Sequence, residues 1–117
     1  MLKMNEDLEG ALRAYLQCLE EKEYFEAHEV LEEAWHPLRL RKDPLANFMK
    51  GLINAAIAFE HLKRNRPGAK ERARRVFACY LRHKISAVPD MHKGLYMQVY
   101  NRIEVLRMQY SDVFGGM

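Results

Sequence analysis

The side chains best suited to chemistry lie in one segment, residues 24–35, which reads YFEAHEVLEEAW. At about 100° per residue in a helix, His28, Leu31 and Trp35 fall within about 60° of one another on an apolar stripe. Glu32 follows His28 by one helical turn and stands at the edge of that stripe, so its carboxylate can reach the imidazole. A zinc-protease motif would place a second histidine where Glu32 stands, so the segment does not match that class.

A second polar stripe lies on an otherwise apolar segment, residues 45–64. Its side chains are spaced at the helical repeat: Lys50, Asn54, Ile57, His61 and Arg64. Polar groups in such apolar surroundings are costly when they lack partners. If the two segments form neighbouring helices, we expect His28 and Glu32 to face Asn54 and His61 across a shared pocket, which is how helical bundles build metal sites.

We predict a polar pocket centred on His28, Glu32 and His61, the residues able to ligate a metal. Mixed imidazole and carboxylate ligands suit a divalent ion such as zinc, manganese or iron. Three neighbours are expected to support the pocket. The amide of Asn54 would orient its polar groups, Trp35 would form an apolar wall, and the carboxylate of Glu29 would lie near its edge.

Two other interpretations of the histidine and glutamate pair stay open at this point. The first, and the simplest, is a buried hydrogen-bonded pair that fixes helix packing without any ligand. The second is metal-free acid–base chemistry on a small molecule with His28 as the base, although no nucleophile or oxyanion donor can be identified beside it. Whether the protein is an enzyme, and with which catalytic residues and cofactor, is therefore left open by the sequence.

Helices must position these residues, because apolar side chains recur at the helical period and no segment alternates with period two. We expect five helices, at residues 8–19, 24–36, 45–64 and 69–81 and after a break at 88–90, with Asn5 and Asp90 as caps of the first and last. Pro37 is expected to end the second helix near His36. The predicted fold is all-α, a compact array of about five helices with the apolar third helix at its centre, in a single domain of residues 1–117.

Gly51 stands inside the expected third helix, where glycine costs up to about 1 kcal/mol relative to alanine. A glycine in that position is explained when another helix approaches closely. We therefore expect the third helix to be crossed by a neighbour near Gly51.

The composition indicates a soluble globular protein, with 117 residues, 49% of them hydrophobic, and a formal net charge of +3. Cys18 and Cys79 fit neither a disulfide scaffold nor a metal knuckle, so we expect reduced thiols. No apolar run reaches the roughly 18 residues of a membrane span, and the N-terminus lacks the apolar stretch of a signal peptide. We expect a cytoplasmic protein that has no membrane partner.

Basic residues gather in residues 61–84, where nine bases stand against one acid. Such a segment can contact phosphates, but a solvated helix face is the simpler explanation. Neither a helix-turn-helix pattern nor a basic platform interleaved with aromatic residues is found, so nucleic acid is disfavoured as a partner.

Two blocks of the sequence resemble a known family. The first is His28-x-x-x-Glu32-x-x-Trp35, preceded by Tyr24-Phe-Glu-Ala, and the second comprises Gly51-Leu-Ile, Ala55-Ala56, His61-Leu62, Asn65 and Gly68-Ala69. Over roughly residues 15–80 they are similar to the bacterial and archaeal domain-of-unknown-function family 309. The resemblance implies an all-helical fold and a His/Glu/Trp motif suspected of binding metal, with no reaction assigned. Lys50 and Asn54 stand where glutamines are expected, and a lysine beside a cation site counts against a metal there.

The sequence thus predicts a small cytoplasmic helical protein with a polar His/Glu pocket between its second and third helices. The pocket would take a small molecule or a divalent metal. The alternative is a helical interaction module in which the cluster is purely structural. In that case the acidic second helix or the basic fourth helix would bind a partner chain or a second copy of the protein.

Overall fold

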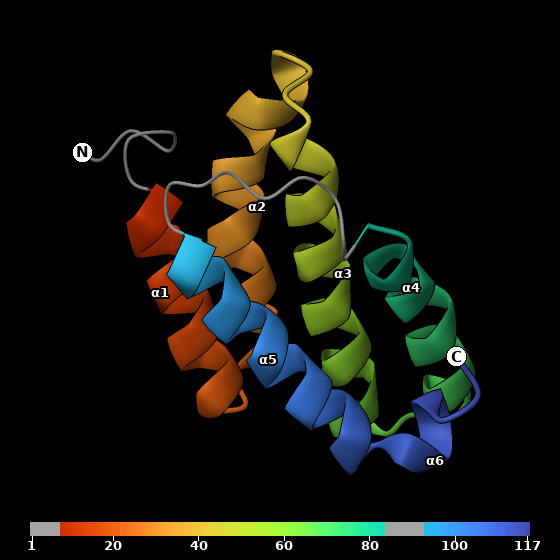
Figure 1. Ribbon diagram of the computed structural model, residues 1–117. Coiled ribbons are helices and arrows are strands. Elements are labelled where there is room, and N and C mark those ends of the chain that lie inside the picture. Colours follow the sequence, from red (N-terminus) through yellow and green to blue (C-terminus); the bar gives the residue numbers. More distant parts are fainter. Residues whose placement is uncertain (1–7, 84–92) are drawn as a thin grey trace.

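The computed structural model describes residues 8–83 and 93–117, and every regular element in these ranges is a helix (Figure 1). The elements are α1 (Leu8–Glu20), α2 (Tyr24–Leu40), α3 (Leu45–Arg64), α4 (Ala69–His83), α5 (Lys93–Gln109) and α6 (Ser111–Phe114). The prediction of an all-α fold is therefore confirmed. Asn5 and Asp90, the expected helix caps, lie outside the described residues.

Helix α3 lies between α2 and α4 and forms the middle of the core (Figure 1). Eleven of its 20 residues are buried, so it needs neighbours on several sides. Helix α1 packs on α2, and α5 packs across α1. In the described ranges, none of the helices has the length and apolar character to cross a membrane.

Gly51 marks a close approach of α3 and α4, as its position predicted. A Cβ atom added at Gly51 would lie 3.3 Å from the Cα atom of Tyr80 and 3.5 Å from the Cβ atom of His83. Both neighbours belong to α4, and a side chain at position 51 would push the two backbones apart. This contact positions the C-terminal end of α4 beside the N-terminal half of α3.

The prediction that Pro37 ends the second helix was wrong, because α2 continues past it. Pro37 lies in the last turn, where its missing N–H removes a single bond, and the next residue, Leu38, is anchored in the core. The helix ends in a Schellman arrangement: the amide of Asp43 donates to the carbonyl of Leu38 (2.9 Å) and the amide of Lys42 to that of Arg39 (3.1 Å). Lys42 has a left-handed backbone with φ 55°.

Helix α1 ends in the same way. The amide of Glu23 donates to the carbonyl of Cys18 (2.8 Å), the amide of Lys22 donates to that of Leu19 (3.2 Å), and Lys22 has φ 60°. Lysine therefore occupies the left-handed position at both helix ends, where glycine or asparagine is the usual signal.

The short helix α6 was not predicted. Its last residue, Phe114, is buried and stacks on Phe77 of α4 with ring centroids 4.4 Å apart. The same ring meets Phe59 of α3 edge-on at 6.0 Å. Four residues are too few to show a helical period, but α6 places an aromatic side chain where it closes the core between α3 and α4.

Candidate functional site

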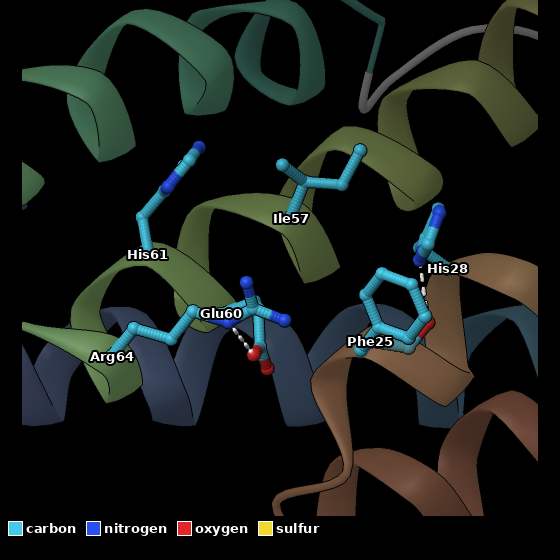
Figure 2. Close-up of a pocket in the computed structure, with 6 residues that line it drawn as sticks. All are labelled: Phe25, His28, Ile57, Glu60, His61 and Arg64. Carbon is cyan, nitrogen blue, oxygen red and sulfur yellow. Dashed lines mark hydrogen bonds and ion pairs between the residues drawn. The ribbon is translucent and has the colours of Figure 1, made fainter.

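A pocket opens where the start of α2 faces the C-terminal half of α3 (Figure 2). Its volume is about 220 Å³. We call it the histidine pocket, and the residues that line it are Phe25, His28, Ile57, Glu60, His61 and Arg64. The two helices pack directly on each other. His28 and His61, which are 33 positions apart in the sequence, therefore line the same pocket.

The imidazole of His28 is held by its own helix. Its Nδ1 atom lies 2.5 Å from the carbonyl oxygen of Phe25. A carbonyl oxygen only accepts hydrogen bonds, so Nδ1 carries the proton and donates it. In the neutral ring Nε2 is then the acceptor, ready for an N–H or O–H group or a metal. The ring of Phe25 packs edge-on against the imidazole at 4.8 Å and fixes its orientation.

His61 is a neutral imidazole at the other end of the pocket. Burial lowers its pKa below the ordinary value of 6.5, and the positive charges of Arg72 and Arg64 lower this pKa further, whereas Glu60 opposes them. At pH 7 the ring is therefore uncharged. It offers one nitrogen as a donor and one as an acceptor.

An ion pair closes the histidine pocket on its charged side. Arg64 Nε lies 2.5 Å from Glu60 Oε2, and the guanidinium group of Arg64 lies 5.7 Å from the ring centroid of Phe25. The first contact lies within α3 and the second joins α3 to α2. Arg64 thus holds the two walls together from the side of α3.

Figure 2 shows how the pocket is divided. Ile57 stands between His28 and His61, and the two imidazoles lie at opposite ends without pointing at each other. The middle of the pocket is therefore apolar, with one imidazole at each end. An elongated small molecule can touch both rings.

The structure places Glu32 and Glu29 outside the pocket. Both side chains are exposed, and neither lines it. In the described part of the chain no hydrogen bond joins Glu32 to His28, and the Nδ1 proton of His28 is donated to the carbonyl of Phe25. The expected histidine and glutamate pair is thus replaced by a contact within the first turn of α2.

Asn54 and Trp35 also lie outside the pocket lining. The Asn54 side-chain amide donates to the carbonyl of Lys50 in the preceding turn of α3 at 3.1 Å, so it orients no pocket group. Trp35 is half-buried at the edge of the core, with the guanidinium of Arg39 5.1 Å from its ring centroid and the ring of His36 at 5.3 Å.

These side chains do not fit a metal held by three protein ligands. Within residues 8–83 and 93–117, no group of three or more His, Cys, Asp or Glu side chains is placed to hold an ion. Of the predicted ligands, His28 and His61 share the pocket and Glu32 does not. Metal binding by this set stays a prediction.

Two lining residues were missed by the sequence analysis, Phe25 and Glu60. Phe25 precedes His28 by three residues and Glu60 precedes Arg64 by four, so helical spacing placed each beside a residue already selected. Phe25 is also 44% exposed, and its ring both lines the histidine pocket and contacts the imidazole of His28.

Comparison with known protein families supports the resemblance seen in the sequence. A family model described as a domain of unknown function, DUF309, matches residues 12–73, which is more than half of the chain. The matched span contains α2 and α3 and therefore every residue that lines the histidine pocket. Neither the curated proteins nor the solved structures contain a significant match.

Proposed function

The chain belongs to the DUF309 family, and we propose that it binds a small molecule in the histidine pocket. The observation that carries the proposal is the joint presence of His28 and His61 in the lining of one pocket. The first belongs to the His/Glu/Trp block and the second to the other block of the sequence. The pocket therefore takes one lining histidine from each block.

The lining indicates what kind of molecule is bound. Phe25 and Ile57 provide apolar walls, and the volume of about 220 Å³ lies below the usual range of about 300–1,000 Å³ for drug-sized ligands. The ligand is therefore small, with a flat or branched apolar part. Because Nε2 of His28 accepts hydrogen bonds, the ligand also carries an O–H or N–H group.

Phenol is a suitable probe, since its ring fits between Phe25 and Ile57 and its hydroxyl can donate to His28. We expect saturable binding in ligand-observed NMR, weakened about tenfold or more in His28→Ala because that hydrogen bond is lost. Glu32→Gln is the matched control: the residue lies one turn further along α2, is exposed and lies outside the pocket. Binding that does not saturate, or that is weakened equally in both variants, would rule the proposal out.

Elemental mass spectrometry of tag-free protein separates this proposal from a metal site. We expect no near-stoichiometric metal, because the described residues assemble only two of the three predicted ligands in the pocket. Near-stoichiometric zinc, manganese or iron that is lost in both His28→Ala and Glu32→Gln would contradict this proposal and show that the site binds a metal.

A further inference from the structure

A second pocket lies on the other side of His61, where the end of α3 meets the start of α4. Its volume is about 460 Å³. We call it the arginine pocket, and its lining residues are His61, Arg64, Arg66, Pro67, Ala69 and Arg72. His61 and Arg64 line both pockets, which are therefore neighbours with a common wall.

Two of the three guanidinium groups in the arginine pocket are held by the protein itself. Arg72 Nη1 donates to the carbonyl oxygen of Pro67 at 3.0 Å. Its guanidinium also lies over Gly68, where an added Cβ atom would be 3.7 Å from Arg72 Cζ. Arg64 is held by its ion pair with Glu60. Side chains ordered before binding lower the entropy cost of taking up a ligand.

Positive charge in the arginine pocket exceeds what its neighbours neutralise. Arg64 pairs with Glu60, whereas neither Arg66 nor Arg72 forms an ion pair with any residue in the described ranges. Three guanidinium groups against one carboxylate leave an excess of two positive charges. After burial, Arg72 and Arg64 are the largest influences that lower the pKa of His61, so the positive field reaches the common wall.

We propose that the arginine pocket binds the phosphate group of a small phosphate monoester. Guanidinium groups donate paired hydrogen bonds to phosphate oxygens. A monoester carries a charge of about −1.5 to −2 at pH 7, which matches the excess of two, whereas a carboxylate would neutralise only one. The phosphate site stands by itself. The further step, that the organic part of the ester enters the histidine pocket past His61, rests on the proposed function.

Inorganic phosphate tests the site directly, in ¹H–¹⁵N NMR titrations at constant ionic strength. Wild-type protein should show saturable changes at the arginine Nε–H signals, and Arg66→Gln with Arg72→Gln should bind at least tenfold more weakly. The matched control is Arg74→Gln with Arg75→Gln, which removes the same charge from exposed positions of α4 outside the pocket. We expect the control to bind as the wild type does.

Equal weakening in the two double variants would overturn the proposal, because it would show diffuse attraction along a basic helix. A wild-type titration that fails to saturate would overturn it as well. Arg66→Gln alone serves if the double variant unfolds, since among the described hydrogen bonds and ion pairs none involves this side chain.

4-Hydroxyphenyl phosphate, whose free hydroxyl can donate to Nε2 of His28, distinguishes an ester from free phosphate. We expect it to bind at least tenfold more tightly than inorganic phosphate, with His28→Ala abolishing this gain and leaving the affinity for inorganic phosphate unchanged. Equal affinity for the two probes would overturn the ester in favour of free phosphate. If inorganic phosphate binds saturably but phenol does not bind, the proposed function in the histidine pocket is contradicted and the phosphate site in the arginine pocket is supported. Binding of a single-stranded RNA oligonucleotide that is lost in the Arg74→Gln, Arg75→Gln variant, and kept in the Arg66→Gln, Arg72→Gln variant, would also overturn the proposal. It would show that the basic helix binds nucleic acid and that the arginine pocket is not the site.

Discussion

At the residue scale, the two histidines of the pocket are set by different surroundings. His28 is oriented by a backbone carbonyl and an aromatic ring of its own helix, whereas His61 is kept neutral by burial and by nearby arginines. His61 can therefore accept a hydrogen bond at neutral pH without first losing a proton, whereas the Nδ1 contact of His28 with its own helix leaves Nε2 to face a ligand. Neutral imidazoles suit the recognition of a donor group on a ligand.

The low pKa of His61 makes folding stability depend on pH. The unfolded chain binds a proton near the ordinary pKa of 6.5, while the folded chain resists it to lower pH. The contribution of His61 is therefore fully present above about pH 7 and is lost as the pH falls through 6.5 and below. In urea denaturation, His61→Gln should lose less stability than the wild type between about pH 7.5 and pH 5.5. Identical pH profiles of the two proteins would contradict the burial of a neutral His61.

Replacing His28 should affect ligand binding more than folding. The side chain is half-buried and makes one hydrogen bond to the backbone, so His28→Ala should cost no more than about 1.5 kcal/mol in the free energy of unfolding. A buried structural pair would cost a few kcal/mol instead. Chemical denaturation decides between them, with Glu32→Gln expected to be close to the wild type. A loss of about 3 kcal/mol or more in His28→Ala would favour the structural interpretation.

The sequence could select His28 and His61 because polar side chains are rare on apolar helix faces and helical spacing assigns each to a face. It could not place Glu32. Whether that carboxylate meets the imidazole depends on which acceptor takes the Nδ1 proton, and in the structure the carbonyl of Phe25, in the preceding turn of the same helix, takes it. Residue spacing does not predict which of two nearby acceptors an imidazole N–H group will use.

At the scale of elements, the helix ends were the hardest to predict. The beginning and end of α3 follow from Pro44 and from the turn after Arg64, and they agree with the structure. The end of α2 does not follow from Pro37, because one missing hydrogen bond in a last turn is outweighed by burial of Leu38. The end is set instead by the left-handed conformation of Lys42, which no sequence signal announces.

Relieving that conformation should stabilise the protein. A left-handed backbone costs a non-glycine residue about 1–2 kcal/mol, partly offset by the greater chain entropy of glycine, so Lys42→Gly should gain up to about 1 kcal/mol. Lys50→Gly, at an exposed position inside α3, should instead lose about 1 kcal/mol. Thermal unfolding measures both. A Lys42→Gly variant that is destabilised as much as Lys50→Gly would show that the end of α2 is not strained.

At the scale of the whole molecule, α3 connects the core to both pockets. Its ring Phe59 touches aromatic residues of other elements, Tyr24 at 5.6 Å, Phe77 at 5.8 Å and Phe114 at 6.0 Å between centroids. The last turn of the same helix carries His61 and Arg64, the wall between the pockets. A rigid, buried helix thus positions the groups that would touch a ligand.

The small helix α6 should contribute more to stability than its length suggests. Phe114→Ala removes a buried ring that stacks on Phe77, and such losses cost about 3–5 kcal/mol in the free energy of unfolding. Met108→Ala is a suitable control, because Met108 is 75% exposed on α5 and should change stability by no more than about 0.5 kcal/mol. Urea denaturation that shows similar small losses for both variants would mean that α6 does not close the core.

The fold class and the central place of α3 could be predicted because the helical period and an apolar surface on all sides are properties of the sequence itself. The arginine pocket could not. It forms only when the turn after α3 brings Arg66 and Arg72 beside Arg64. In a segment rich in basic residues, the sequence does not indicate which arginines come together.

The central claim is that His28 and His61 serve one ligand. The most direct measurement is a long-range ¹H–¹⁵N NMR spectrum of the imidazoles, recorded during a titration with phenol. We expect the Nδ1-protonated form of His28 before any probe is added, and then changes at both rings that saturate with one common Kd. A response from only one ring, or two different Kd values, would mean that the histidines do not act in a single site.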